Sequence, residues 1–322
     1  MQKKGISTQN FCKAIGIPER SFYFWLMARA RGEKVRGRKT APANKLLPNE
    51  RKEIVKILLN KSWSDLTPRD LYYKLLDEDG RIVASPATFY RIAKKSNLLM
   101  KRVKTNSSNR FNREKPHIVA RRINEVWAWD TTQICSDIRT ERYYLYVIID
   151  IWSRLVVGWC LEEEEKTEHA IELWKRALER QYISGNGLIN HKDNGSIMTS
   201  REMIRFVRAT NMIDSYSRAG VSDDNPFPEA LFRTTKYSRK YPGYFCSVAG
   251  GRVYFEKYFD DYNFINRHSG IQFLAPAQRH YGEEEKILAK RNAIIDDFYK
   301  RNKHRYSGKK KLFLPITEVR IN

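Results

Sequence analysis

Apolar residues recur every three to four positions through the first third of the chain, which is the spacing of amphipathic helices. Residues 6–29 follow this spacing with a break at Gly16 and Pro18, which predicts two short helices joined by a tight turn. The spacing returns over residues 66–80 and 85–99 and predicts a second pair. Each pair has the outline of a DNA-binding helix-turn-helix, although short helix pairs also occur as plain structure.

The pattern changes after residue 117, where Val, Ile, Tyr and Trp gather in short runs typical of strands. The first three runs have short connections, one of them the turn residues Ser153 and Arg154, which predicts antiparallel strands. Helical and apolar segments then alternate, and this predicts an α/β core. The predicted strands are 125–134, 142–152 and 155–161, followed by a helix at 167–181, an apolar stretch at 187–191 and a helix at 199–210.

Two stretches without periodicity divide the chain. Both are rich in Lys and Arg with Gly, Pro, Ser or Asn, a composition typical of basic linkers that can lie along phosphates. The predicted organisation is a helix-turn-helix at 1–32, a basic linker at 33–46, a second helix-turn-helix at 47–100, a second basic linker at 101–116, the α/β core at 117–281 and a helical, basic extension at 282–322.

The charge balance points to a polyanionic partner. The chain has 60 Lys and Arg against 37 Asp and Glu, a formal net charge of +23. The first 115 residues hold 27 of the basic and 10 of the acidic side chains, so the excess is strongest over the predicted helix pairs. Nucleic acid is the first candidate partner, and a basic chain that is merely soluble is the alternative.

Other sites and locations are disfavoured by the composition. The four cysteines, at 12, 135, 160 and 246, form no CxxC pair, which indicates neither a zinc site nor a disulfide scaffold. The amino terminus lacks an apolar signal region and no apolar run is long enough for a membrane span. We expect a cytoplasmic protein bound to DNA, with no membrane partner.

Three acids stand at the ends of predicted elements: Asp130 in a strand, Asp193 after the apolar stretch, and Glu229 at a helix start. Phosphodiester chemistry with two metal ions needs such a set, because Mg²⁺ prefers carboxylate oxygens. Each acid alone has a structural interpretation, as a turn residue or as a favourable charge at a helix N-terminus. The combination favours the metal site.

The sequence resembles the bacterial insertion-sequence transposases that have a retroviral-integrase-type core, most closely the large group numbered three. That family has 35 residues between the second and third members of its Asp-Asp-Glu triad, and 35 separate Asp193 from Glu229. Asp223 and Asp224 would leave only 29 and 30. The resemblance runs through WAWDTTQI, VIIDIWSRLVVGW, GLINHKDNGS, NPFPEALFRTTKY and YNFINRHSGIQFLAPAQRH, and the helical region before them is also similar.

The resemblance implies an RNase H-like mixed sheet flanked by helices, in an α/β core preceded by all-α helix-turn-helix domains. It implies a DNA transposase that binds terminal inverted repeats and catalyses strand cleavage and strand transfer. Asp130, Asp193 and Glu229 would hold two Mg²⁺ ions, for which Mn²⁺ could substitute. The implied partners are double-stranded DNA, as element ends and target, and further copies of the chain in a homodimer or higher oligomer. The implied location is the nucleoid of the bacterial cytoplasm.

Two residues depart from the family pattern. Lys192 puts a cation beside Asp193, where it could pair with phosphate or depress metal affinity, and Pro228 precedes Glu229 in the first helical turn. His191 is expected to be a scaffold residue and Asp150 to hold the turn at 153–154. The residues predicted to contact DNA are Arg233, Lys236, Lys192, Arg20, Arg91, Lys94, Lys95, Arg36, Arg38, Lys101 and Arg102.

Two other functions stay open. A domesticated transposase could act as a DNA-binding regulator without catalysis, but the three acids at family spacing disfavour this. An RNase H-type nuclease acting on RNA:DNA hybrids would share the core, but it would have no need of paired helix-turn-helix units.

Overall fold

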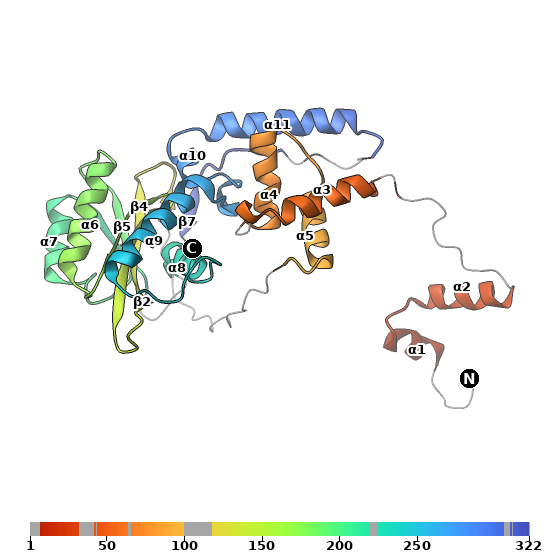
Figure 1. Cartoon of the computed structure of the whole chain (residues 1–322), viewed down its shortest axis with the longest axis horizontal. Coiled ribbons are helices and arrows are strands. Elements are labelled where there is room, and N and C mark those ends of the chain that lie inside the picture. The colour runs from red at the N-terminus through yellow and green to blue at the C-terminus, as the bar shows by residue number, and fades with distance from the viewer. Residues whose placement is uncertain are drawn as a thin grey trace. The chain divides into compact units, whose positions relative to one another are not determined.

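The computed structural model describes residues 7–31, 42, 44–63, 66–99, 118–218, 224–305, 310 and 312–321. The chain divides into two compact units (Figure 1). The first contains helices α1 (Thr8–Ala14) and α2 (Glu19–Ala30), and the second begins at Leu47. Among the described residues, no helix is both long and apolar enough to cross a membrane.

In the first unit, two helices lie where the periodicity predicts them. The Ser7 hydroxyl accepts a hydrogen bond from the backbone N–H of Asn10 at 3.3 Å and so caps α1. The turn to α2 passes through Gly16 at φ +67°, a conformation that costs glycine little. Few apolar side chains are buried between the helices, chiefly Cys12 and Ala28. A role for this unit in DNA binding remains a prediction.

The second unit starts with a bundle of short helices. Thr67 and Ser85 act as N-caps, each followed by a proline in the first helical turn, as their sequence context predicts. Ile54, Leu71 and Phe89 are buried between the helices and hold them together. The elements are α3 (Pro48–Leu58), η1 (Lys61–Trp63), α4 (Pro68–Lys74), η2 (Leu75–Asp79) and α5 (Pro86–Lys95).

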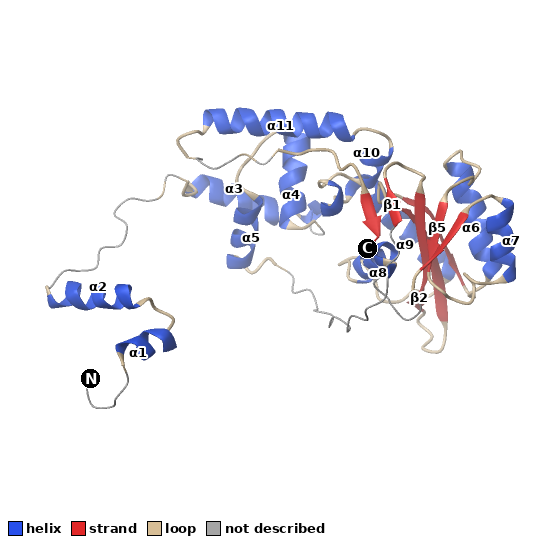
Figure 2. Ribbon diagram, turned by 180° about the vertical axis from the view of Figure 1, so that it is seen from behind, coloured by secondary structure: helices blue, strands red, loops and turns tan. Residues whose placement is uncertain are grey.

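A buried cluster of charges joins this bundle to later parts of the same unit. Asp77 in η2 accepts hydrogen bonds from Arg291 at 2.6 and 2.8 Å and lies 2.7 Å from a guanidinium nitrogen of Arg267. Arg291 belongs to α11 (Glu284–Arg301), which lies along the bundle in both ribbon views (Figures 1 and 2). Both arginines are almost fully buried; Asp77 pairs with both of them, and Glu78 lies 3.6 Å from a guanidinium nitrogen of Arg267.

The centre of the second unit is a five-stranded mixed sheet in the order β4-β3-β2-β5-β6 (Figure 2). The first three strands form an antiparallel meander, and β5 and β6 then run parallel to β2. This is the RNase H-like arrangement that the resemblance implies, and the predicted fold class is confirmed. The strands are β2 (Val126–Cys135), β3 (Arg142–Asp150), β4 (Val156–Glu162), β5 (Ile189–Lys192) and β6 (Ile213–Tyr216).

Helices cover both faces of this sheet, and β2 shows why. Its residues alternate between the faces: Trp127 and Trp129 pack with Trp174 on one side, while Val126 and Ala128 join the apolar cluster on the other. The tryptophan side is covered by α6 (Thr167–Arg180) and α7 (Arg201–Ala209), and the opposite side by α8 (Pro226–Lys236) and α9 (Val248–Asp260). Asp130 has the same strand parity as Ala128, which places it on the α8 side.

The chain then turns back and closes on the start of the core. The elements η4 (Asp261–Ile265), η5 (Ser269–Ile271) and α10 (Pro276–His280) lead into α11. After α11, the short strand β7 (Val319–Ile321) pairs antiparallel with β1 (Ile118–Ala120). Ile321 is fully buried in the core cluster. The sequence predicted a basic extension here but not this strand.

Candidate catalytic site

The three predicted acids come from two neighbouring strands and one helix. In the parallel pair β2–β5, Ala128 lies opposite His191; Asp130 follows two residues later within β2, and Asp193 directly follows the end of β5. Strand spacing of about 4.8 Å keeps such positions close together. Glu229 lies in the first turn of α8, the helix that packs on β2 from the same side.

The electrostatics of Asp130 show that the carboxylates interact. Burial, and after it the nearby charges of Asp193 and Glu229, raise the pKa of Asp130 to about 7. A hydrogen bond from the Thr131 backbone N–H to Asp130 Oδ1, at 2.8 Å, works in the opposite direction. A shift of this size on a carboxyl beside two others is typical of functional sites.

The acids are not gathered into a finished set of metal ligands. Across the part of the chain that the structure describes, no three His, Cys, Asp or Glu side chains converge on one point where a metal ion would sit. The structure therefore brings the three carboxylates into electrostatic contact, and their role as a triad remains a prediction.

The segment before α8 is fixed to both β2 and β5. His191 Nε2 donates to the carbonyl oxygen of Asp224 at 2.9 Å, and Nδ1 lies 3.1 Å from Ser215 Oγ. Because a carbonyl only accepts, His191 carries its proton on Nε2, and burial lowers its pKa. Asn225 Nδ2 donates to the carbonyl oxygen of Trp129 at 3.1 Å, next to Asp130. His191 is thus a scaffold residue, as predicted.

The start of α8 explains its two prolines. Asn225 occupies the N-cap position but makes no capping hydrogen bond with its side chain, which reaches β2 instead. Pro226 and Pro228 have no backbone N–H, so the first turn has fewer donors that need a cap. Arg154 adds a further contact, with its guanidinium carbon 3.9 Å from the ring centroid of Phe227. These contacts fix the direction of the helix turn that carries Glu229.

Asp193 has a partner that the sequence did not reveal. The Ser217 hydroxyl donates to Asp193 Oδ1 at 2.6 Å, and Asn194 Nδ2 donates to the Ser217 carbonyl oxygen at 2.7 Å. Ser217 follows β6, 24 residues beyond Asp193. No local pattern marks it, because the contact depends on β6 lying beside β5.

Lys192 is buried and points away from Asp193. Its side chain has no exposed surface, and Nζ lies 2.7 Å from Asp214 Oδ1 on β6. The approach angle is poor for a hydrogen bond, so the attraction is mainly ionic, and the Tyr216 ring lies 4.9 Å from Nζ. Alternation along β5 puts residues 192 and 193 on opposite faces. A buried ammonium of this kind does not present itself to DNA, which corrects the DNA contact predicted for Lys192.

The other predicted residues lie as follows. Asp150 Oδ1 accepts hydrogen bonds from the backbone N–H and the hydroxyl of Ser153, both at 2.7 Å, so it holds the turn as predicted. Lys236 Nζ donates to Thr132 Oγ1 at 2.7 Å on the same side of β2 as Asp130, and Arg233 is exposed on α8. Arg20, Arg91, Lys94 and Lys95 are exposed, whereas Arg36, Arg38, Lys101 and Arg102 lie outside the described residues.

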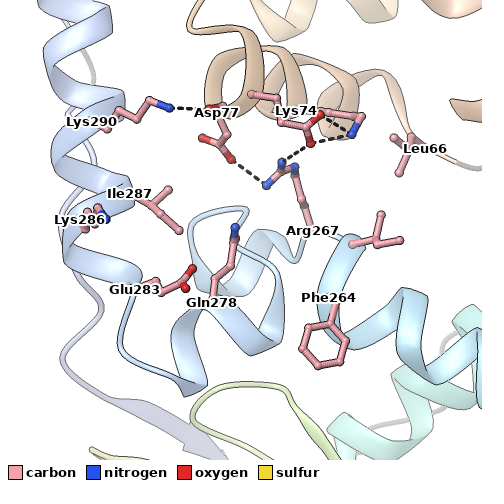
Figure 3. Close-up of a pocket in the computed structure, with 12 residues that line it drawn as sticks. Leu66, Lys74, Asp77, Phe264, Arg267, Gln278, Glu283, Lys286, Ile287 and Lys290 are labelled. Carbon is pink, nitrogen blue, oxygen red and sulfur yellow. Dashed lines mark hydrogen bonds and ion pairs between the residues drawn. The ribbon is translucent and has the colours of Figure 1, made fainter.

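A cavity of about 500 Å³ lies elsewhere in the second unit (Figure 3). Two ion pairs lie in its wall: Arg267 reaches Asp77, and Lys74 Nζ donates to Glu78 at 2.6 Å. The described residues that line it include none of the three acids. The cavity therefore lies at the junction between the helical bundle and α11, away from the three acids.

Comparisons with known proteins relate the sheet region of the chain to a described family. Residues 120–222 match the family described as the integrase core domain. Over 158 residues the chain is 31% identical to the transposase InsF for insertion sequence IS3A of Escherichia coli (strain K12), covering 48% of this chain and 53% of the relative. It is 30% identical over 154 residues to the transposase for insertion sequence element IS904 of Lactococcus lactis subsp. lactis (strain IL1403), covering 48% and 60%.

The chain thus spans little more than half the length of these relatives. Among solved structures, the catalytic domain of Mos1 mariner transposase is 16% identical with a TM-score of 0.38, and covers 54% of this chain and 82% of its own. The HTLV-2 integrase catalytic core domain is 18% identical with a TM-score of 0.35, and covers 49% and 97%.

Proposed function

We propose that this chain, which carries an integrase core domain and resembles insertion-sequence transposases, is a DNA transposase that cuts and rejoins phosphodiester bonds at the ends of a mobile element. The observation that supports this best is the environment of Asp130. Its half-buried carboxyl lies beside two further carboxylates, one directly after the adjacent strand and one on a helix, and its pKa rises to about 7.

The donor set fits a hard divalent cation. Asp130, Asp193 and Glu229 offer only oxygen, and their mutual repulsion is the kind that a dication relieves. These three residues would hold Mg²⁺, with Asp130 and Asp193 at one position and Glu229 completing a second. When bound, such ions supply an activated oxygen nucleophile and stabilisation of the leaving oxygen.

Neighbouring residues hold parts of this set of carboxylates in position. Ser217 orients the Asp193 carboxylate, and the contacts of His191 and Asn225 fix the segment from which Glu229 projects. Arg233 and Lys236 follow Glu229 by four and seven residues, so they share its helix face and would contact the phosphates of an element end.

Recognition of the DNA would fall to the helical bundle. The exposed basic residues of α5, Arg91, Lys94 and Lys95, would contact the groove or backbone of the terminal inverted repeats. Because an element has two ends, a dimer or a higher oligomer would form the synaptic complex. The protein would act in the bacterial cytoplasm, on the nucleoid.

The test is cleavage and joining of labelled DNA ends by the purified chain, with substrates taken from the inverted repeats that flank its gene. We expect Glu229→Gln to abolish both reactions in Mg²⁺ and in Mn²⁺ while end binding stays within about twofold. Glu172→Gln, on the exposed part of α6, is the matched control and should retain activity.

Three outcomes would contradict the proposal. Joining of ends by the Glu229→Gln variant would remove Glu229 from the chemistry. Wild-type protein that cuts an RNA:DNA hybrid but never joins DNA ends would be a nuclease and no transposase. Protein that binds the ends without cutting would be a regulator.

A further inference from the structure

The connection between α8 and α9, residues 237–247, carries two exposed tyrosines, and we call it the tyrosine loop. Tyr237 and Tyr244 each keep 54% of their surface exposed. A single exposed aromatic residue needs no explanation, but a large ring gains much when it contacts a partner. Two such rings on one short connection are therefore a candidate binding surface, provided that their surroundings indicate a partner.

Basic residues alternate with these tyrosines. Residues 230–251 contain no acidic side chain and four basic ones, all exposed: Arg233, Lys236, Arg239 and Lys240. Exposed aromatic rings among cations are typical of surfaces that bind single strands of nucleic acid, because rings stack on bases while cations meet phosphates. The charge of this surface is thus complementary to a polyanion.

The tyrosine loop is held against the end of β2. The backbone N–H of Phe245 donates to the Cys135 carbonyl oxygen at 3.0 Å. The rings of Phe245 and Tyr241 lie 6.0 Å apart and pack on the core cluster. Between them, Gly243 turns the chain at φ +90°, a conformation that side chains other than hydrogen rarely allow. The inward rings fix the loop, and Tyr244 stays outside.

Both α8 and β2 run from the three acids toward the tyrosine loop. Lys236, in the last turn of α8, donates to Thr132, which follows Asp130 by two residues on the same face of β2. Tyr237 lies eight residues beyond Glu229, or about 12 Å at the rise of a helix. Because a DNA strand advances about 3.4 Å per nucleotide, this distance spans about three to four nucleotides.

We propose that the tyrosine loop binds unpaired nucleotides of the DNA strand next to the cleavage site, with Tyr237 and Tyr244 stacked on bases and Arg239 and Lys240 at the phosphates. This inference rests on the proposed function and adds to it the state of the substrate, in which a few base pairs beside the cut are open. Opening exposes base faces that the duplex covers, and stacking on two rings offsets part of its cost.

The test compares two DNA ends of the same length, one fully paired and one with about four mispaired nucleotides next to the cleavage site. Fluorescence anisotropy with the full chain gives both dissociation constants, and contacts shared by the two ends cancel in their ratio. We expect wild type to bind the opened end at least about fivefold more tightly. The double variant Tyr237→Ala/Tyr244→Ala should lose this preference, whereas Tyr237→Phe/Tyr244→Phe, which keeps both rings, should retain it.

Two further variants separate stacking from charge. Tyr182→Ala is the matched control, because Tyr182 is 96% exposed but follows α6, the helix that covers the opposite face of the sheet. It should keep the preference. Arg239→Gln should weaken binding of both ends by a similar factor and leave their ratio unchanged, since a phosphate contact does not distinguish paired from unpaired nucleotides.

Three results would overturn the inference: equal binding of both ends by wild type, a preference that persists in the alanine double variant, or its loss in Tyr182→Ala. Circular dichroism verifies that each variant is folded. The failure of the proposed function has a different signature. A chain that prefers the opened end through the two tyrosines but neither cuts nor joins DNA would keep the tyrosine loop and lose the proposed function. A chain that cuts and joins ends without this preference would keep the function and lose the role of the loop.

Discussion

The buried pair of Lys192 and Asp214 allows a sharp test, because its two halves are unequally exposed. The lysine side chain is fully buried, while that of Asp214 keeps 23% of its surface exposed. Asp214 also accepts hydrogen bonds from Asn190 Nδ2 at 3.1 Å and from the Tyr216 hydroxyl at 3.2 Å. Removing the acid or the base should therefore have very different costs.

Asp214→Ala leaves an ammonium in the interior without a counter-charge, and breaking a buried pair in this way costs about 3–5 kcal/mol of the free energy of unfolding. Lys192→Met replaces the base by an apolar side chain of similar length, and Asp214 keeps its two donors and part of its water. We expect that variant to stay within about 1 kcal/mol of wild type, because a buried ion pair often contributes little over its apolar replacement.

The measurement is urea unfolding followed by tryptophan fluorescence, with the double variant Lys192→Met/Asp214→Ala included. We expect the double variant to be clearly more stable than Asp214→Ala alone, since no buried charge is left. Burial lowers the pKa of Lys192, and the nearby acid opposes this. In Asp214→Ala the pKa should fall further, so the loss should shrink at alkaline pH as the ammonium deprotonates. Equal losses in the two single variants would refute this reasoning.

Three other predictions follow from single contacts. Asp77→Ala, which removes the carboxylate that contacts both buried arginines, should cost about 3–5 kcal/mol in urea unfolding, whereas the neighbouring, half-exposed Glu78→Ala should cost less than about 1 kcal/mol. Burial lowers the pKa of His268 to about 4 in the folded protein, so the unfolded chain takes up a proton here at higher pH than the folded protein does. The folded state is therefore favoured most above about pH 6.5, where the imidazole is neutral in both states. That contribution is lost as the pH falls toward 4, and thermal unfolding of His268→Phe should depend less on pH over this range. Gly251→Ala would place a Cβ 2.4 Å from Leu161 Cδ2, and the overpacking should lower the free energy of unfolding by about 1–3 kcal/mol in the same urea assay.

The sequence by itself was enough for many of the helices and strands and for naming the site candidates. The caps at Thr67 and Ser85 and the strand that carries Asp130 follow from interactions over a few residues, and short-range rules describe these well. The α/β core and its RNase H-like sheet were predicted correctly, the latter through the family resemblance.

What the tertiary structure decided is which side chains meet. Lys192 forms an ion pair with Asp214, Ser217 donates a hydrogen bond to Asp193, and Thr131 donates one to Glu165. The partners are 22 to 34 residues apart in the sequence. β7 closes on β1 across the whole core. Each of these contacts depends on which strands are neighbours in the sheet and on where the connecting loops run. Both are fixed when the two faces of the sheet are buried together. A local pattern fixes the face on which a side chain lies, and the packed sheet alone fixes what stands beside it.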